Sequence, residues 1–228
     1  TFVQFQPPRD KKNHYLVLPL IPTILARKIY LNRNLTAITK AAFPVIDAHN
    51  HLWGNWSVND VIKTMDEVGI LGYCDLTGNV RIEFAEGGYI IHPGNINDFF
   101  TNCRDRFPGR FYCFTMANFA SPVNKPLFMD EKRFVDEFIE TLNNHVQKGA
   151  RGLKILKELG LHYRDKNGDL INCNDERLFP VWEEAARLKL PVLIHQADPS
   201  GFFEPVTPEN EHYESLIKYP SWSFADPK

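Results

Sequence analysis

Hydrophobic residues recur along this chain with two alternating spacings from residue 43 onward. Short, nearly all-apolar runs are typical of strands in a sheet that is covered on both faces. Between them, apolar residues repeat every three or four positions, which predicts amphipathic helices. The predicted strands cover residues 45–47, 70–76, 110–116, 152–156 and 191–195, and the predicted helices cover 57–69, 97–106, 130–146 and 180–188.

Local capping signals support these helix boundaries. Ser57 and Asp60 have the spacing of a capping box, and Asn97 is a plausible N-cap for the second helix. Gly149 is positioned to end the third helix, and Pro180 suits the first residue of the fourth. Strands that alternate with helices of this length predict parallel βαβ units in one α/β domain over residues 43–228. Residues 1–42 have no clear period, so we expect an N-terminal extension lying over the core.

Composition narrows the function classes. The 228 residues are 43% hydrophobic and 24% charged, the ordinary mix for a globular protein with a sizeable core. A net charge of −2 gives no support for nucleic acid or an anionic membrane as a partner. No apolar run approaches the about 20 residues of a membrane span. The four cysteines form no C-x-x-C pair, which favours reduced thiols. We therefore expect a soluble protein, more plausibly cytoplasmic than exported, that acts on a small molecule, with a homo-oligomer as an open possibility.

Histidines mark the ends of two predicted strands. His49 and His51 follow the first strand with one residue between them, and residues i and i+2 of an extended strand point the same way. His195 ends the fifth strand, and the remaining histidines fall in loops or helices. Carboxyl ends of parallel strands gather reactive groups at one edge. Because neutral imidazole binds zinc and similar ions, we predict that these three residues hold a divalent metal, most plausibly Zn²⁺.

Other residues near these strand ends have candidate roles beside ordinary structural ones. Asp47 would orient a ligating imidazole, or bond to nearby backbone instead. Lys154, in the fourth strand, would hold a substrate carboxylate or, after carbamylation, bridge two metal ions, or else form a structural ion pair. Thr77 ends the second strand and is a candidate pocket residue. Aromatic residues would line the pocket or simply pack in the core; they are Trp53, Trp56, Phe202 and Phe203.

The chain resembles the amidohydrolase superfamily. The closest branch is the amidohydrolase-related proteins that include aminocarboxymuconate-semialdehyde decarboxylase-like enzymes. The segments that carry the resemblance are FPVIDAHNHLWG (43–54), GARGLKILKELGL (149–161) and LPVLIHQADPSGFFEP (190–205). The segment NEHYESLIKYPSWSF (210–224) also looks like part of a bacterial subgroup of uncharacterised metal-dependent hydrolases.

This resemblance implies a distorted TIM-type (β/α)₈ barrel with one or two divalent metals, usually zinc. His49 and His51 match the strand-one ligands, His195 matches the strand-five ligand, and Lys154 matches the strand-four region loosely. Family members continue through three further strands, which supply another histidine and the aspartate that acts as general base. A complete barrel uses about 250 residues. We therefore expect about five of the eight βα units here, with strand five as an uncovered edge and the general-base aspartate beyond the chain end.

The resulting prediction is a metal-dependent hydrolase that uses metal-activated water on a C–N or C–O bond. Decarboxylation on the same metal site is the alternative chemistry, because the branch includes lyases. A metal-dependent deoxyribonuclease also begins with H-x-H, but a phosphodiester substrate would favour a basic rim, and the net charge of −2 argues mildly against it. A truncated, non-catalytic fragment or assembly module, pairing through its open sheet edge, is the remaining alternative.

Overall fold

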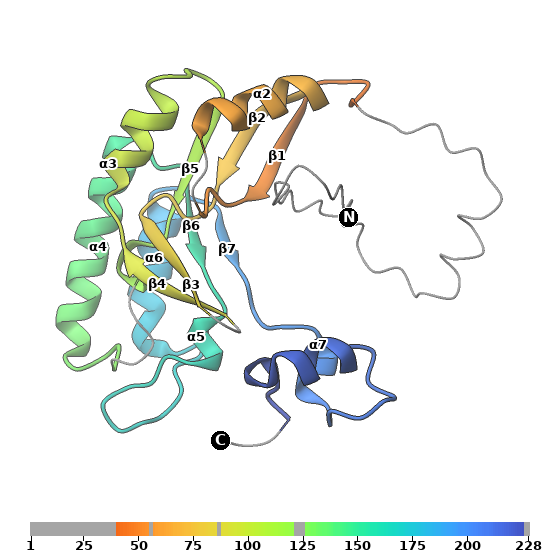
Figure 1. Ribbon diagram of the computed structural model, residues 1–228. Helices are drawn as coiled ribbons and strands as arrows, with labels where there is room; N and C mark the ends of the chain where they lie inside the picture. Colours follow the sequence, from red (N-terminus) through yellow and green to blue (C-terminus); the bar gives the residue numbers. More distant parts are fainter. Residues whose placement is uncertain (1–39, 55–56, 86–87, 121–125, 226–228) are drawn as a thin grey trace.

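A five-stranded parallel sheet organises the molecule (Figure 1). The computed structural model describes residues 40–54, 57–85, 88–120 and 126–225. Within these ranges the strand order is β1-β2-β5-β6-β7, and every neighbouring pair is parallel. The strands are β1 (Val45–Asn50), β2 (Ile70–Asp75), β5 (Phe111–Thr115), β6 (Gly152–Ile155) and β7 (Val192–Ile194).

The prediction of a (β/α)₈ barrel is wrong for the described residues. They form a mixed α/β fold in which β1 pairs with β2 and β7 pairs with β6, so the sheet remains an open half-barrel. Barrel closure requires the first and last strands to pair around an interior filled by side chains, and five strands do not achieve this. As a result, β6 is buried along its whole length, whereas apolar residues of the two edge strands, among them Ile46 and Ile194, are exposed.

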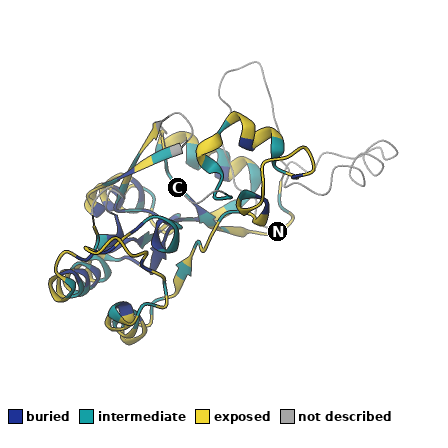
Figure 2. Ribbon diagram, turned by 90° about the horizontal axis from the view of Figure 1, so that it is seen from below, coloured by how far each residue is buried: buried dark blue, intermediate teal, exposed yellow. Residues whose placement is uncertain are grey.

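Helices pack against the sheet and bury two hydrophobic clusters. One cluster surrounds Phe119 and Phe138, and the other surrounds Phe100 and Phe111. Figure 2 shows buried residues in the strands and exposed residues on the outer sides of the helices. The longer helices are α2 (Val58–Val68), α4 (Glu131–Lys148), α6 (Phe179–Arg187) and α7 (Tyr213–Lys218). The shorter ones are α3 (Ile96–Phe99), η1 (Phe100–Arg104), η2 (Ala117–Phe119), α5 (Glu158–Leu161), η3 (Glu176–Leu178), η4 (Ser200–Phe203) and η5 (Pro220–Trp222).

Helix ends agree with the capping signals in part. Gly149 ends α4 with a φ of 119°, a left-handed conformation that glycine adopts without steric cost. Pro180 lies in the first turn of α6, as the second residue of the helix and not the first as predicted. Ser57 occupies the N-cap of α2, but its side chain makes no capping hydrogen bond. Asn95, rather than Asn97, caps α3 and accepts a hydrogen bond from the Asn97 N–H.

An antiparallel hairpin of β3 (Val80–Ala85) and β4 (Gly88–Pro93) was not predicted. The run Val-Arg-Ile-Glu-Phe at 80–84 alternates apolar and polar residues, which is the period of a half-exposed strand. This signal was therefore present in the sequence. The hairpin follows β2 and brings aromatic residues toward the histidines described below.

Residues 1–39, which include nearly all of the predicted N-terminal extension, lie outside the described part of the chain. The domain boundary at residue 42 therefore stays a prediction. Across the described ranges, no helix is long and apolar enough to cross a membrane.

Candidate metal centre

His49 and His51 lie together where β1 ends. Their ring centroids are 6.0 Å apart, and the ring planes are inclined by 77°. Two imidazoles that bind one zinc ion through nitrogens at about 2.0–2.1 Å have centroids roughly 5–6.5 Å apart, so this pair has the spacing that a shared divalent ion requires.

Side-chain hydrogen bonds hold the backbone that carries these two histidines. Asp47 accepts hydrogen bonds from the His49 N–H (3.2 Å) and from the side-chain amide of Asn50 (2.7 Å). The Asn50 side-chain oxygen accepts from the His51 N–H at 2.8 Å. The register with β2 also shifts between Asp47 and Asn50. Asp47 thus holds the turn through these two contacts. Burial lowers the pKa of His49, and the negative charge of Asp47 opposes that shift.

His195 follows β7 and extends its pairing, because its N–H donates to the carbonyl of Ile155 at 3.0 Å. Its positive charge, when protonated, also lowers the pKa values of both His49 and His51, so the three side chains are close enough to interact electrostatically. However, among the described residues, no group of three or more His, Cys, Asp or Glu side chains is arranged to hold a metal ion. The His49–His51 pair therefore fits an ion, and His195 is near without completing the ligand set.

Burial keeps all three imidazoles neutral. It is the largest cause that lowers the pKa of each, and the charge of Lys154 is the second. The pKa of His51 falls furthest, to about 3. A metal ligand must present a neutral imidazole, so these residues are in the binding-competent charge state at neutral pH.

Lys154 is fully buried beside these histidines. Its Nζ has no hydrogen-bond partner among the described residues, and its residue exposure is 0%. Burial lowers the pKa of Lys154 to about 8, and the charge of Glu158 opposes that shift. Buried polar groups are nearly always hydrogen-bonded, so an amine without a partner in the described part of the chain is a candidate for binding a substrate group.

Glu158 is a site residue that the sequence analysis missed. It is buried, Tyr89 donates a hydrogen bond to its side chain, and its Oε2 has no partner in the described structure. Burial raises its pKa. Glu158 directly follows the fourth strand and its loop, so the same strand-end rule that selected the histidines would have found it.

Thr77 contacts Asp75, a second site residue that the sequence analysis did not select. The Thr77 hydroxyl lies 2.8 Å from Trp53 Nε1, 3.0 Å from His51 Nδ1 and 3.4 Å from Asp75 Oδ1. Both Thr77 and Asp75 are buried. Burial raises the pKa of Asp75 to about 6, although hydrogen bonds from Thr77 and Leu52 oppose the shift. Asp75 ends β2, so its position at a strand end was visible in the sequence.

The aromatic residues predicted to line the pocket lie in two different parts of the fold. Trp53 stacks on His51 and also lies near Tyr89 of the hairpin, with ring centroids 5.5 Å apart. Phe202 packs instead on His212 and Trp222, in the C-terminal segment around α7. Phe203, in the same segment, stacks on Phe224. Trp56 lies outside the described residues. The aromatic surroundings of the histidines therefore include the hairpin.

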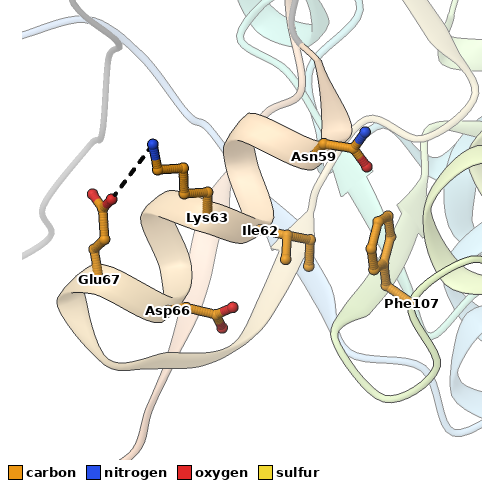
Figure 3. Close-up of a pocket in the computed structure, with 6 residues that line it drawn as sticks. All are labelled: Asn59, Ile62, Lys63, Asp66, Glu67 and Phe107. Atoms are coloured by element: carbon orange, nitrogen blue, oxygen red, sulfur yellow. Dashed lines mark ion pairs between the residues drawn. The ribbon is translucent and has the colours of Figure 1, made fainter.

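A surface pocket of about 510 Å³ lies elsewhere, on the side of α2 (Figure 3). Ile62 and Phe107 face each other there, and Lys63 pairs with Glu67 at 4.0 Å. None of the predicted site residues lines this pocket, so it is separate from the histidine site.

In comparisons with known proteins, no family model matches this chain and no curated protein matches it. The resemblance to the amidohydrolase superfamily therefore stays a hypothesis, and the geometry of the site carries the functional argument.

Proposed function

We propose that this chain carries the metal site of a divalent metal-dependent hydrolase of the amidohydrolase type, acting on a C–N or C–O bond. The observation that carries the proposal is the set of three neutral histidines around one buried, unpartnered amine, that of Lys154. A structural role for the histidines alone gives no reason to bury a lysine without a partner beside them.

His49 and His51 would hold the ion. His195 lies near them without completing a three-ligand group among the described residues, and it is the candidate third ligand. Zinc suits these imidazole nitrogens best. The spacing of the first two rings supports the assignment. When bound, such an ion acidifies a water molecule and polarises a substrate carbonyl. The chain supplies neutral nitrogen ligands for this purpose, since burial has already removed the proton that would compete with the metal.

Lys154 would bind the substrate oxygen that gains negative charge during the reaction. Its Nζ has no hydrogen-bond partner in the described part of the chain, and a pKa of about 8 leaves the amine mostly protonated at neutral pH. The Glu158 carboxylate helps to keep it so, because its charge raises the pKa of Lys154. A buried positive charge fixed near a developing oxyanion is more effective than one in water, since the local dielectric constant is lower.

The Lys154 amine also supports decarboxylation as a second candidate. A buried ammonium group without a partner is a suitable counter-ion for a substrate carboxylate. The two candidates share the same residues and differ in product. Assays on p-nitrophenyl esters and p-nitroanilides report hydrolysis, whereas release of CO₂ from a panel of carboxylic acids reports decarboxylation.

The decisive experiment is zinc binding by calorimetry together with elemental analysis. The wild-type chain, the variant His49→Ala/His51→Ala and the variant His195→Ala are compared. His145→Ala is the matched control, because His145 is a partly buried histidine in another part of the fold. We expect wild type and the control to bind zinc equally, and the two site variants to bind about tenfold more weakly or worse. Equally low metal content in all four proteins would overturn the proposal.

A further inference from the structure

We propose that Asp75 acts through the Thr77 hydroxyl to hold His51 in the tautomer that is protonated on Nδ1, so that Nε2 presents its lone pair to the metal. The inference rests on the proposed metal site and assigns positioning roles to two buried residues. Neither Asp75 nor Thr77 then contacts the ion.

The contacts converge on one oxygen atom. Thr77 Oγ1 lies 2.8 Å from Trp53 Nε1, 3.0 Å from His51 Nδ1 and 3.4 Å from Asp75 Oδ1. Asp75 Oδ1 also receives the backbone N–H of Thr77 at 3.2 Å and that of Leu52 at 3.4 Å. Asp75 Oδ1 therefore accepts hydrogen bonds from two backbone N–H groups, which is the behaviour of an ionised carboxylate oxygen.

The number of donors and lone pairs at the Thr77 hydroxyl selects one hydrogen-bond arrangement. A hydroxyl has one proton to donate and two lone pairs to accept with. Trp53 Nε1 only donates, so it occupies one lone pair of Thr77 Oγ1. The single hydroxyl proton goes either to Asp75 or to His51. If it goes to Asp75, the second lone pair accepts the proton of His51 Nδ1, and all three contacts are satisfied.

The opposite arrangement has two disadvantages. If Thr77 donated to His51 Nδ1, the buried Asp75 would lose a side-chain donor, which is unfavourable in a low-dielectric site. The neutral ring of His51 would then carry its proton on Nε2, which blocks that nitrogen as a ligand. The 3.0 Å distance between Thr77 Oγ1 and His51 Nδ1 suits donation in either direction. The Asp75 carboxylate therefore decides which of the two groups donates.

Trp53 stabilises the same orientation from a second direction. Its indole donates to Thr77 Oγ1 and its ring stacks on His51, with centroids 4.2 Å apart and planes inclined by 27°. The imidazole is thus fixed at Nδ1 by a hydrogen bond and over its face by a ring. Both contacts pre-orient Nε2 before a metal arrives.

The first test is the ¹⁵N NMR signature of the His51 ring in the metal-free wild-type protein, which needs no variant and does not depend on zinc binding. We expect the pattern of a ring protonated on Nδ1, and in Thr77→Val a mixture of tautomers. Thr77→Ser, which keeps the hydroxyl, should restore the wild-type pattern. A wild-type ring protonated on Nε2 would overturn the inference, even if zinc binds.

The second test is zinc affinity by calorimetry. Thr77→Val should bind zinc about 10- to 100-fold more weakly than wild type, and Thr77→Ser should stay close to wild type. The matched control is Thr115→Val, because Thr115 Oγ1 is likewise bonded to a histidine ring, that of His145, at 2.7 Å. Thr115→Val should leave zinc affinity unchanged. Wild-type affinity in Thr77→Val would contradict the positioning role, whereas absence of zinc binding in the wild type would instead refute the proposed metal site.

Discussion

Trp53 lies face to face with His51, and this stacking makes a fluorescent side chain the direct neighbour of a proposed metal ligand. The same indole bonds to Thr77, so its position is fixed relative to the imidazole. Any ion held by His51 would therefore be within a few ångströms of an indole ring, and that closeness gives an optical measurement of metal binding.

Titration with Cu²⁺ should quench the fluorescence of Trp53. A paramagnetic ion bound beside an excited indole returns it to the ground state without emission. We expect saturable quenching in wild type that is lost in Trp53→Phe. The control is Trp182→Phe, since Trp182 packs on Phe119 in the main core, and its removal should leave the quenching intact. Undiminished quenching in Trp53→Phe would place the copper elsewhere.

The core around Phe138 should dominate stability. Phe138 has 0% exposure, and its ring lies 5.0 Å from that of Phe119. Phe138→Ala removes buried aromatic surface and leaves a cavity, so we expect a loss of about 3–5 kcal/mol in the free energy of unfolding, measured with urea. Phe43 is 79% exposed, and Phe43→Ala should change stability by about 0.5 kcal/mol or less. Similar losses in both variants would mean that the helix-covered side of the sheet is not the core.

His145 should make the protein sensitive to acid. Burial lowers its pKa from 6.5 to about 4, so between these pH values the unfolded chain binds more protons than the folded one. Stability is therefore present above pH 6.5 and is lost as the pH falls toward 4.

His145→Gln removes this titration. We expect its urea-unfolding profile from pH 7 to pH 4 to be flatter than that of wild type by about 1 kcal/mol, a figure reduced to allow for partial solvent exposure. The three site histidines have lowered pKa values too, so part of the slope should persist. Identical slopes in wild type and variant would show that His145 titrates normally in the folded state.

Arg177 joins carboxylates on the surface between η3 and the preceding turn. Its guanidinium bonds to Asp165 at 2.9 Å and to Asp175 at 2.6 Å. Because Arg177 is only 28% exposed and Asp165 is buried, Arg177→Ala should lower the free energy of unfolding by about 2 kcal/mol. The control is Arg133→Ala, because the ion pair of Arg133 with Glu137 is 74% exposed on the arginine side and should contribute far less to stability. Thermal melts at low salt and at 0.5 M salt measure the stability of both variants. An equal loss of stability in Arg177→Ala and Arg133→Ala would contradict a stabilising role for the ion pairs of Arg177.

Local sequence patterns were sufficient for most elements. The apolar runs predicted the strands of the main sheet, and Gly149 and Pro180 marked the ends of two helices, because hydrophobic period and capping depend on residues a few positions apart. The hairpin at 80–93 was missed although its alternation was visible. The barrel was inferred from a resemblance, and it is contradicted because the edge strands β1 and β7 do not pair with each other in the described sheet.

The sequence selected the histidines of the candidate site and two of its buried polar residues, Thr77 and Lys154, but it did not select Asp75 or Glu158. His49, His51 and His195 were selected because strand ends meet at one edge of a parallel sheet. Asp75 ends β2 and Glu158 follows β6 and its loop, so the strand-end rule could have selected both. Their burial was not visible in the sequence, because a carboxylate is common on surfaces. Phe202 was expected in the pocket, and its neighbours in the folded chain are His212 and Trp222.

The sequence by itself therefore determined where the strands of the main sheet and helices α2, α4 and α6 lie, and that the fifth strand forms an edge, since these features arise from short-range periodicity and chain order. Only the tertiary structure decided that Lys154 and Glu158 are buried with atoms that have no hydrogen-bond partner among the described residues, and that Thr77 joins His51 to Asp75. Burial, pKa and hydrogen-bond polarity depend on which distant segments pack together, and that information appears only when the chain is folded.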